Sequence, residues 1–145
     1  MNNSENEVNV LDELSKGACM GKDAIQFVLD KVTDESLKNE LETQYQKYDE
    51  VFQEIKQIYP EYSYEEPHQT NAMNKMMTWY GIEMKTMLDS TTTKIAELIM
   101  QGTNMGIIEG RRLLNHKDTD ENVKRIVQKY VDMQEDAVEK LKSFL

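Results

Sequence analysis

Apolar residues recur at steps of three and four positions along nearly the whole chain. This spacing matches the turn of an α-helix, and the alternation that is typical of β-strands is absent. The exception is the stretch YPEYSYEEPH, which holds both prolines, Pro60 and Pro67. The pattern therefore predicts an all-α protein with five helices, at residues 7–31, 35–59, 71–88, 92–115 and from the turn at 118–121 to the C-terminus.

Polar residues mark where the predicted helices begin and end. Thr33 and Asp34 offer a cap for the second helix, and Pro60 ends it because a helix rarely continues into proline. The run 89–91, Asp-Ser-Thr, competes for backbone hydrogen bonds and separates the third helix from the fourth. The run 118–121 has the form of a capping box, with Asp118 as the cap and an acid three residues later.

Helix lengths predict the topology. Four helices have about 25 residues each, or roughly 37 Å, and each carries one apolar stripe, which favours a bundle. Short loops predict two antiparallel pairs. Residues 60–91 are long enough to return the chain to the opposite end, so we expect a ferritin-like four-helix bundle with a long helical crossover between the second and third bundle helices. The chain is then one domain, 1–145, with a flexible tail at 1–6.

Two long phrases carry a resemblance to a known family. The phrases are LSKGACMGKDAIQFVLDKVTDESLKNEL and WYGIEMKTMLDSTTTKIAELIMQGTNMGIIEGRRLL, and the second contains Trp79 in the predicted crossover. With the order of the helices, they resemble a family of uncharacterised bacterial ferritin-like four-helix-bundle proteins. The resemblance covers nearly the whole chain and implies this fold and a bacterial source, without a settled activity.

Composition excludes several functions. The chain has 145 residues, 17 basic and 27 acidic, and a net charge of −10, which opposes binding to nucleic acid phosphates. The single Cys cannot form an internal disulfide or a Cys-based zinc site, so a reducing, cytoplasmic location is expected. The uncharged stretch 98–108, about 11 residues, is too short for membrane insertion, and MNNSENEV is no secretory leader.

Iron binding requires inward-facing acids and histidines. Ferritin-like iron proteins use Glu from two helices and Glu-x-x-His from the other two. Glu65 and His68 have this spacing but lie in the proline-bounded loop, His116 closes the fourth helix, and Glu109 lies beside its stripe. Since the stripes themselves hold no acid, we expect the acids to form a solvated coat and no cofactor to be bound. A degenerate iron or copper site is the alternative.

Methionines crowd the predicted third helix. Such a set packs a core, forms an adaptable contact surface or, through soft thioethers, holds Cu(I). Helical spacing favours the first two. The residues on this face are Met73, Met76, Met77, Tyr80, Met84 and Met87.

Glycines repeat at four-residue steps within two predicted helices, at Gly17 and Gly21 and at Gly102, Gly106 and Gly110. Each costs roughly 1 kcal/mol of helix stability relative to Ala, so a structural reason is needed. Small residues let helices approach closely. The repeats predict either a narrow contact facing bulky residues or a groove for a ligand or a second chain.

No nucleophile or phosphate-binding motif is present. The favoured hypothesis is therefore a non-enzymatic bundle that acts through protein contacts, as a homodimer or with another protein. Metal binding at a degenerate site and small-molecule binding in a cavity beside the glycines are the two alternatives.

Overall fold

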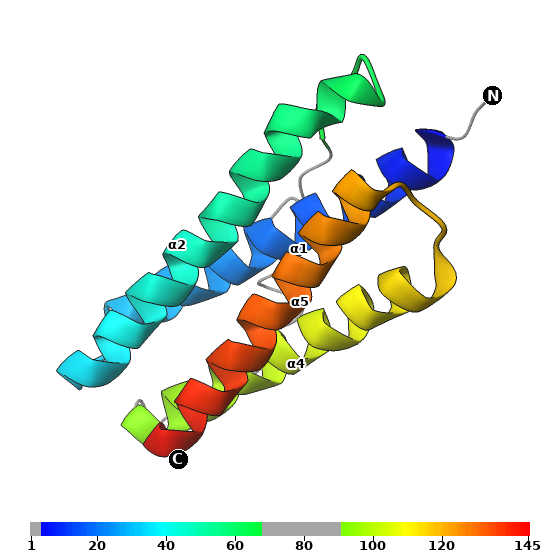
Figure 1. Ribbon diagram of the computed structural model, residues 1–145. Coiled ribbons are helices and arrows are strands. Elements are labelled where there is room, and N and C mark those ends of the chain that lie inside the picture. The colour runs from blue at the N-terminus through cyan, green and yellow to red at the C-terminus, as the bar shows by residue number, and fades with distance from the viewer. Residues whose placement is uncertain (1–3, 68–90) are drawn as a thin grey trace.

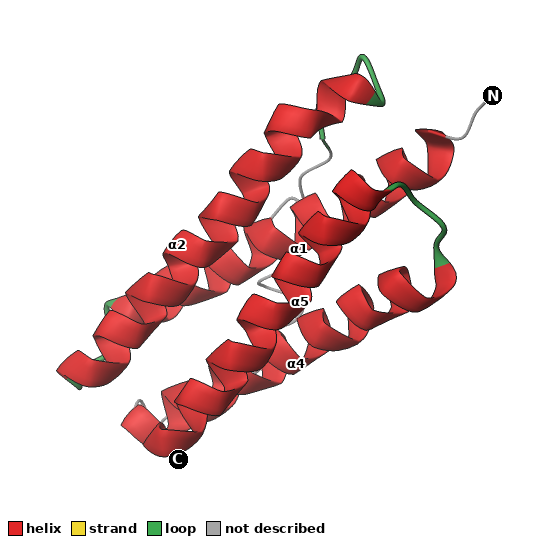
Figure 2. Cartoon of the chain, in the orientation of Figure 1, coloured by secondary structure: helices red, strands yellow, loops and turns green. Residues whose placement is uncertain are grey.

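The computed structural model describes residues 4–67 and 91–145, and both parts are helical. The four long helices of the sequence prediction are confirmed (Figure 1), and no strand occurs in the described residues (Figure 2). The predicted helix at 71–88 lies outside the described residues, together with His68, Trp79 and the methionine face. The elements are α1 (Ser4–Leu29), α2 (Glu35–Ile58), η1 (Tyr59–Glu61), α4 (Thr92–His116), α5 (Glu121–Leu141) and η2 (Lys142–Phe144).

Side-chain caps set the first residue of three helices. The carboxylate of Asp34 accepts the Leu37 N–H at 2.9 Å, as the sequence predicts. Thr91 caps α4. The cap of α5 is Asp120, which accepts the Val123 N–H, so the predicted capping box that begins at Asp118 is wrong by two residues.

The N-terminal end of α1 extends further than expected. Residues 4–6, which the sequence assigned to a flexible tail, are helical. The Asn6 amide donates to the carbonyl oxygen of Asp118 at 3.1 Å, and the Glu7 carboxylate accepts the Asp120 N–H at 2.9 Å. These contacts with the α4–α5 loop supply the stabilisation that a free tail would lack.

The helices pack as two pairs that share one apolar core. Figure 1 shows α1 beside α2 and α4 beside α5, each pair joined by a short turn. Residues later in α1 contact residues earlier in the segment that holds α2 and η1. Asp12 bonds to Tyr59, whereas Lys22, further along α1, bonds to Asp49. The two pairs meet mainly where α2 packs on α5, and α1 and α4 approach each other less closely. This uneven packing leaves space between α1 and α4.

Two acids lie inside the bundle, which corrects the expectation that acids avoid the core. Glu7 is 6% exposed and Asp12 is 7% exposed. The Tyr59 hydroxyl donates to Asp12 at 2.8 Å, and Glu7 accepts the backbone N–H described above. Both carboxylates have hydrogen bonds that offset part of the energy lost on leaving water.

No helix in the described ranges combines the length and apolar character that crossing a membrane demands.

Candidate functional site

A groove of about 370 Å³ lies between α1 and α4. Its walls include Gly17 and Gly21 from α1 and Gly102 and Gly106 from α4. Its floor is formed by Thr103 of α4 and by side chains that reach across from α2 and α5, namely Tyr48, Tyr130 and Gln134. Apolar side chains of α1 and α4, such as Ile25 and Ile99, complete the walls between the glycines.

The wall glycines make room for specific side chains from α2 and α5. A β-carbon on Gly21 would lie 2.5 Å from Cζ of Tyr48, and one on Gly17 would overlap the hydroxyl of Tyr130. A β-carbon on Gly106 would overlap the Gln134 amide. The predicted narrow contact with bulky residues is thus present.

Gly110, the last glycine of the α4 repeat, does not line the groove. It is buried against α5, where a β-carbon would lie 2.5 Å from Cγ2 of Val131. The repeat therefore serves two purposes, because its first two members form the groove wall and its last member packs against a neighbouring helix.

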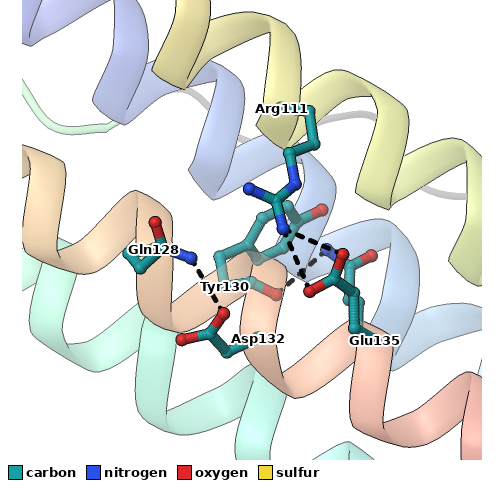
Figure 3. A network of polar contacts seen from close by, with 6 residues as sticks. Arg111, Gln128, Tyr130, Asp132 and Glu135 are labelled. Carbon is teal, nitrogen blue, oxygen red and sulfur yellow. Dashed lines mark hydrogen bonds and ion pairs between the residues drawn. The ribbon is translucent and has the colours of Figure 1, made fainter.

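Hydrogen bonds hold the groove floor in place. The Tyr48 hydroxyl donates to Oε1 of Gln134 at 3.3 Å, and Nε2 of Gln134 donates to the Tyr130 carbonyl oxygen at 3.1 Å. The rings of Tyr48 and Tyr130 meet edge to face, with centroids 6.2 Å apart. Thr103 donates to the carbonyl oxygen of Ile99. Figure 3 shows the Tyr130 ring extending from α5 toward α4 and α1.

The two floor tyrosines remain neutral across the physiological pH range. Burial raises the pKa of Tyr48 to about 12. Burial also raises the pKa of Tyr130, and the nearby Tyr48 and Glu109 raise it further. A protonated phenol can donate and accept hydrogen bonds, so the floor offers uncharged polar groups to a guest.

The mouth of the groove carries charges and flexible apolar side chains. Glu13, Lys16 and Glu109 lie at its edge. Nζ of Lys16 is 3.7 Å from Oε1 of Glu13. Met20 and Met105 lie on opposite sides, and Met105 is 47% exposed. The mouth can therefore adapt to an apolar guest, because methionine side chains are flexible.

The residues proposed as metal ligands do not come together where the structure describes them. Glu109 is exposed at the groove mouth, His116 is exposed at the end of α4, and Glu65 is exposed in the loop after η1. In residues 4–67 and 91–145, no three His, Cys, Asp or Glu side chains are grouped to hold a metal ion. Iron or copper binding stays a prediction, and His68 lies outside these ranges.

Gln134 is the groove residue that the sequence patterns missed. It lies one turn after Tyr130 and beside Met133 of the predicted stripe, so an amide on the edge of an apolar face was the available signal. Tyr48 and Thr103 lie on predicted stripes, but helical spacing does not show that they share a cavity with Gly17 and Gly21.

Comparison with family models, curated proteins and solved structures finds no match for the chain. The resemblance to bacterial ferritin-like proteins therefore stays a prediction, and the interpretation of the site rests on the groove.

Proposed function

We propose that the protein binds a small, mostly apolar molecule in the groove between α1 and α4. The observation that carries the proposal is the cavity of about 370 Å³, with its glycine walls and polar floor. Known small-molecule sites have similar volumes, about 300–1,000 Å³, and combine apolar walls with a few polar groups.

The groove floor supports binding. Tyr48 and Gln134 hydrogen-bond to each other, so the floor is ordered before a guest arrives. Preorganised sites lose less entropy on binding. The raised pKa of Tyr48 keeps its phenol protonated, so it serves as a hydrogen-bonding group and does not act as a base at neutral pH.

A blocking substitution tests this proposal. Gly102→Leu places a branched side chain on the groove wall, whereas Asn104→Leu places the same side chain on an exposed position of α4. Naphthalenemethanol is the neutral probe, and calorimetry measures its Kd. We expect Gly102→Leu to raise the Kd at least about tenfold, which corresponds to a loss of about 1.4 kcal/mol of binding free energy. Asn104→Leu should leave the Kd unchanged. Equal binding to all three proteins, or none to the wild type, contradicts the proposal.

The ferritin-like arrangement is a second, structural proposal. The positions of the C-terminal end of α2 and the N-terminal end of α4 support it. Tyr62 donates to Asp120 at one end of α5, and Thr93 donates to the Phe144 carbonyl oxygen beyond its other end. With 21 residues, α5 separates these points by about 30 Å. This separation supports a connection from α2 to α4 that spans the bundle, as a crossover between two antiparallel pairs requires.

Distance measurement tests the crossover. Spin labels at Ser63→Cys and Thr93→Cys, in a Cys19→Ser background, should lie about 30 Å apart. A separation below about 15 Å, the length of about three helical turns, would place both labels at the same end of the bundle and contradict the crossover.

Self-association is a second candidate function, favoured by an exposed apolar site beside the groove. Met105 is 47% exposed and Ile108 is 52% exposed on α4. Light scattering should detect a dimer that Met105→Gln with Ile108→Gln dissociates. A wild-type monomer across the accessible concentration range would remove this candidate.

A further inference from the structure

We infer that the guest of the α1–α4 groove is an organic amine with an apolar body, whose ammonium group lies at the mouth beside Glu109. This inference rests on the proposed function and names the class of ligand. Its evidence is the charge at the mouth, the neutral polar floor and the apolar side chains that line the groove between them.

Charges at the groove mouth favour a cation. The described residues that line the groove include two acids, Glu13 and Glu109, and one base, Lys16. Lys16 lies against Glu13, so these two charges largely compensate each other. Glu109 forms no ion pair with any residue of the described parts. Within the described residues, Glu109 is therefore a negative charge without an ion-pair partner at the edge of an apolar cavity.

Glu109 and the floor residues Tyr130 and Gln134 line the same groove. The charge of Glu109 contributes to the raised pKa of Tyr130, whose hydroxyl lies at the groove wall with the Gln134 amide as a polar neighbour. This hydroxyl lies against Gly17, where a β-carbon would overlap its oxygen. An ammonium group has three donors. It can therefore pair with the Glu109 carboxylate and keep donors for the uncharged polar groups that line the groove.

The remaining groups disfavour an anion. Tyr48, Thr103 and Gln134 are uncharged, so the described part of the floor offers no cation to hold a carboxylate or phosphate. The net charge of −10 adds a long-range field that attracts cations and repels anions. Among the described residues that line the mouth, Lys16 is the one base, and an acidic guest would have to compete with Glu13 for it.

Three probes that share one apolar body test the inference. Naphthylmethylamine, naphthalenemethanol and naphthoic acid differ only in carrying a positive, neutral or negative head group. Calorimetry at low salt measures their Kd values with the wild type, with Glu109→Gln and with Glu139→Gln. The last variant removes the same charge from an exposed position on α5.

We expect the amine to bind about threefold or more tightly than the alcohol, as for an exposed ion pair, and the acid to bind most weakly. Glu109→Gln should abolish the preference, Glu139→Gln should keep it, and added salt should reduce it. Equal affinities, a preference for the acid, or a preference that survives in Glu109→Gln would overturn the inference while leaving the proposed function intact. If no probe binds the wild type, the proposed function itself fails.

Discussion

A β-carbon on Gly21 would lie 2.5 Å from Cζ of Tyr48 and 2.7 Å from both of its ε-carbons. The backbone of α1 therefore touches the flat ring of a tyrosine from α2. Tyr48 is 4% exposed, hydrogen-bonded to Gln134 and packed edge to face on Tyr130. Because these contacts restrain the ring, it cannot move aside easily for a larger residue.

Gly21→Ala should therefore destabilise the fold, although Ala is the better helix former. The gain in helix propensity is about 1 kcal/mol, whereas overpacking a core costs about 1–3 kcal/mol. We expect the free energy of unfolding in urea to fall by about 1 kcal/mol. Gly102→Ala, at the wall of the open groove, is the control and should not destabilise. If Tyr48→Leu does not relieve the effect of Gly21→Ala, the steric explanation is wrong.

The buried pair of Tyr59 and Asp12 gives a second stability prediction. Tyr59 is 1% exposed, and its hydroxyl donates to a carboxylate that is 7% exposed. Tyr59→Phe removes this donor and should lower the free energy of unfolding by about 2 kcal/mol, as for a hydrogen bond to a charged group. Tyr62→Phe is the matched control, because its partner Asp120 is exposed, and it should cost less than about 1 kcal/mol. If the two substitutions lowered the free energy of unfolding equally, burial would not explain the strength of the Tyr59–Asp12 hydrogen bond.

Stability at alkaline pH should depend on Tyr48. Burial raises its pKa from 10.0 to about 12, so between these values the unfolded chain has lost a proton that the folded chain keeps. The free energy of unfolding should then fall with rising pH, by about 1.4 kcal/mol per pH unit from this group. Because other groups titrate in this range, the measurement is the difference between wild type and Tyr48→Phe at each pH. A difference that is constant above pH 10 would contradict the prediction.

Lys22 and Asp49 form the most shielded of the ion pairs within the described residues. Nζ of Lys22 is 2.8 Å from Oδ1 of Asp49 and 5.1 Å from the centroid of the Phe52 ring. Lys22→Met keeps an unbranched apolar chain and should lower the free energy of unfolding by up to about 1 kcal/mol at neutral pH. Arg111→Met is the control (its pair with Glu135 is drawn in Figure 3), and it should cost less, since both side chains are nearly half exposed.

The same pair predicts an acid dependence. The hydrogen bond from Lys22 lowers the pKa of Asp49 below its ordinary 3.8. The stabilisation is therefore complete above pH 3.8 and is lost as the pH falls through the lowered pKa of the folded state. The difference between wild type and Lys22→Met should shrink in that acidic range. A difference that persists after Asp49 is protonated would show that packing, and not charge, produced it.

Local sequence signals predicted the positions of the helices well, but they predicted poorly the contacts between residues that are far apart in the sequence. Asp34 could be identified as a cap because its contact with Leu37 spans three residues. The start of α5 was misplaced because Asp118 and Asp120 are both suitable caps. The choice between them depends partly on Glu7, which contacts the Asp120 N–H across 113 positions. The burial of Glu7 escaped prediction for the same reason.

The sequence by itself determined the helical nature of the described parts, since the three-to-four-residue period of the apolar positions is a local property of the helix. It also placed Gly17 with Gly21, and Gly102 with Gly106, on common faces, because four residues make about one turn. Only the tertiary structure decided which glycines line a groove and which, like Gly110, pack on a neighbouring helix away from it. That outcome depends on how each helix is rotated and how far apart α1 and α4 lie, and packing across the whole bundle sets both.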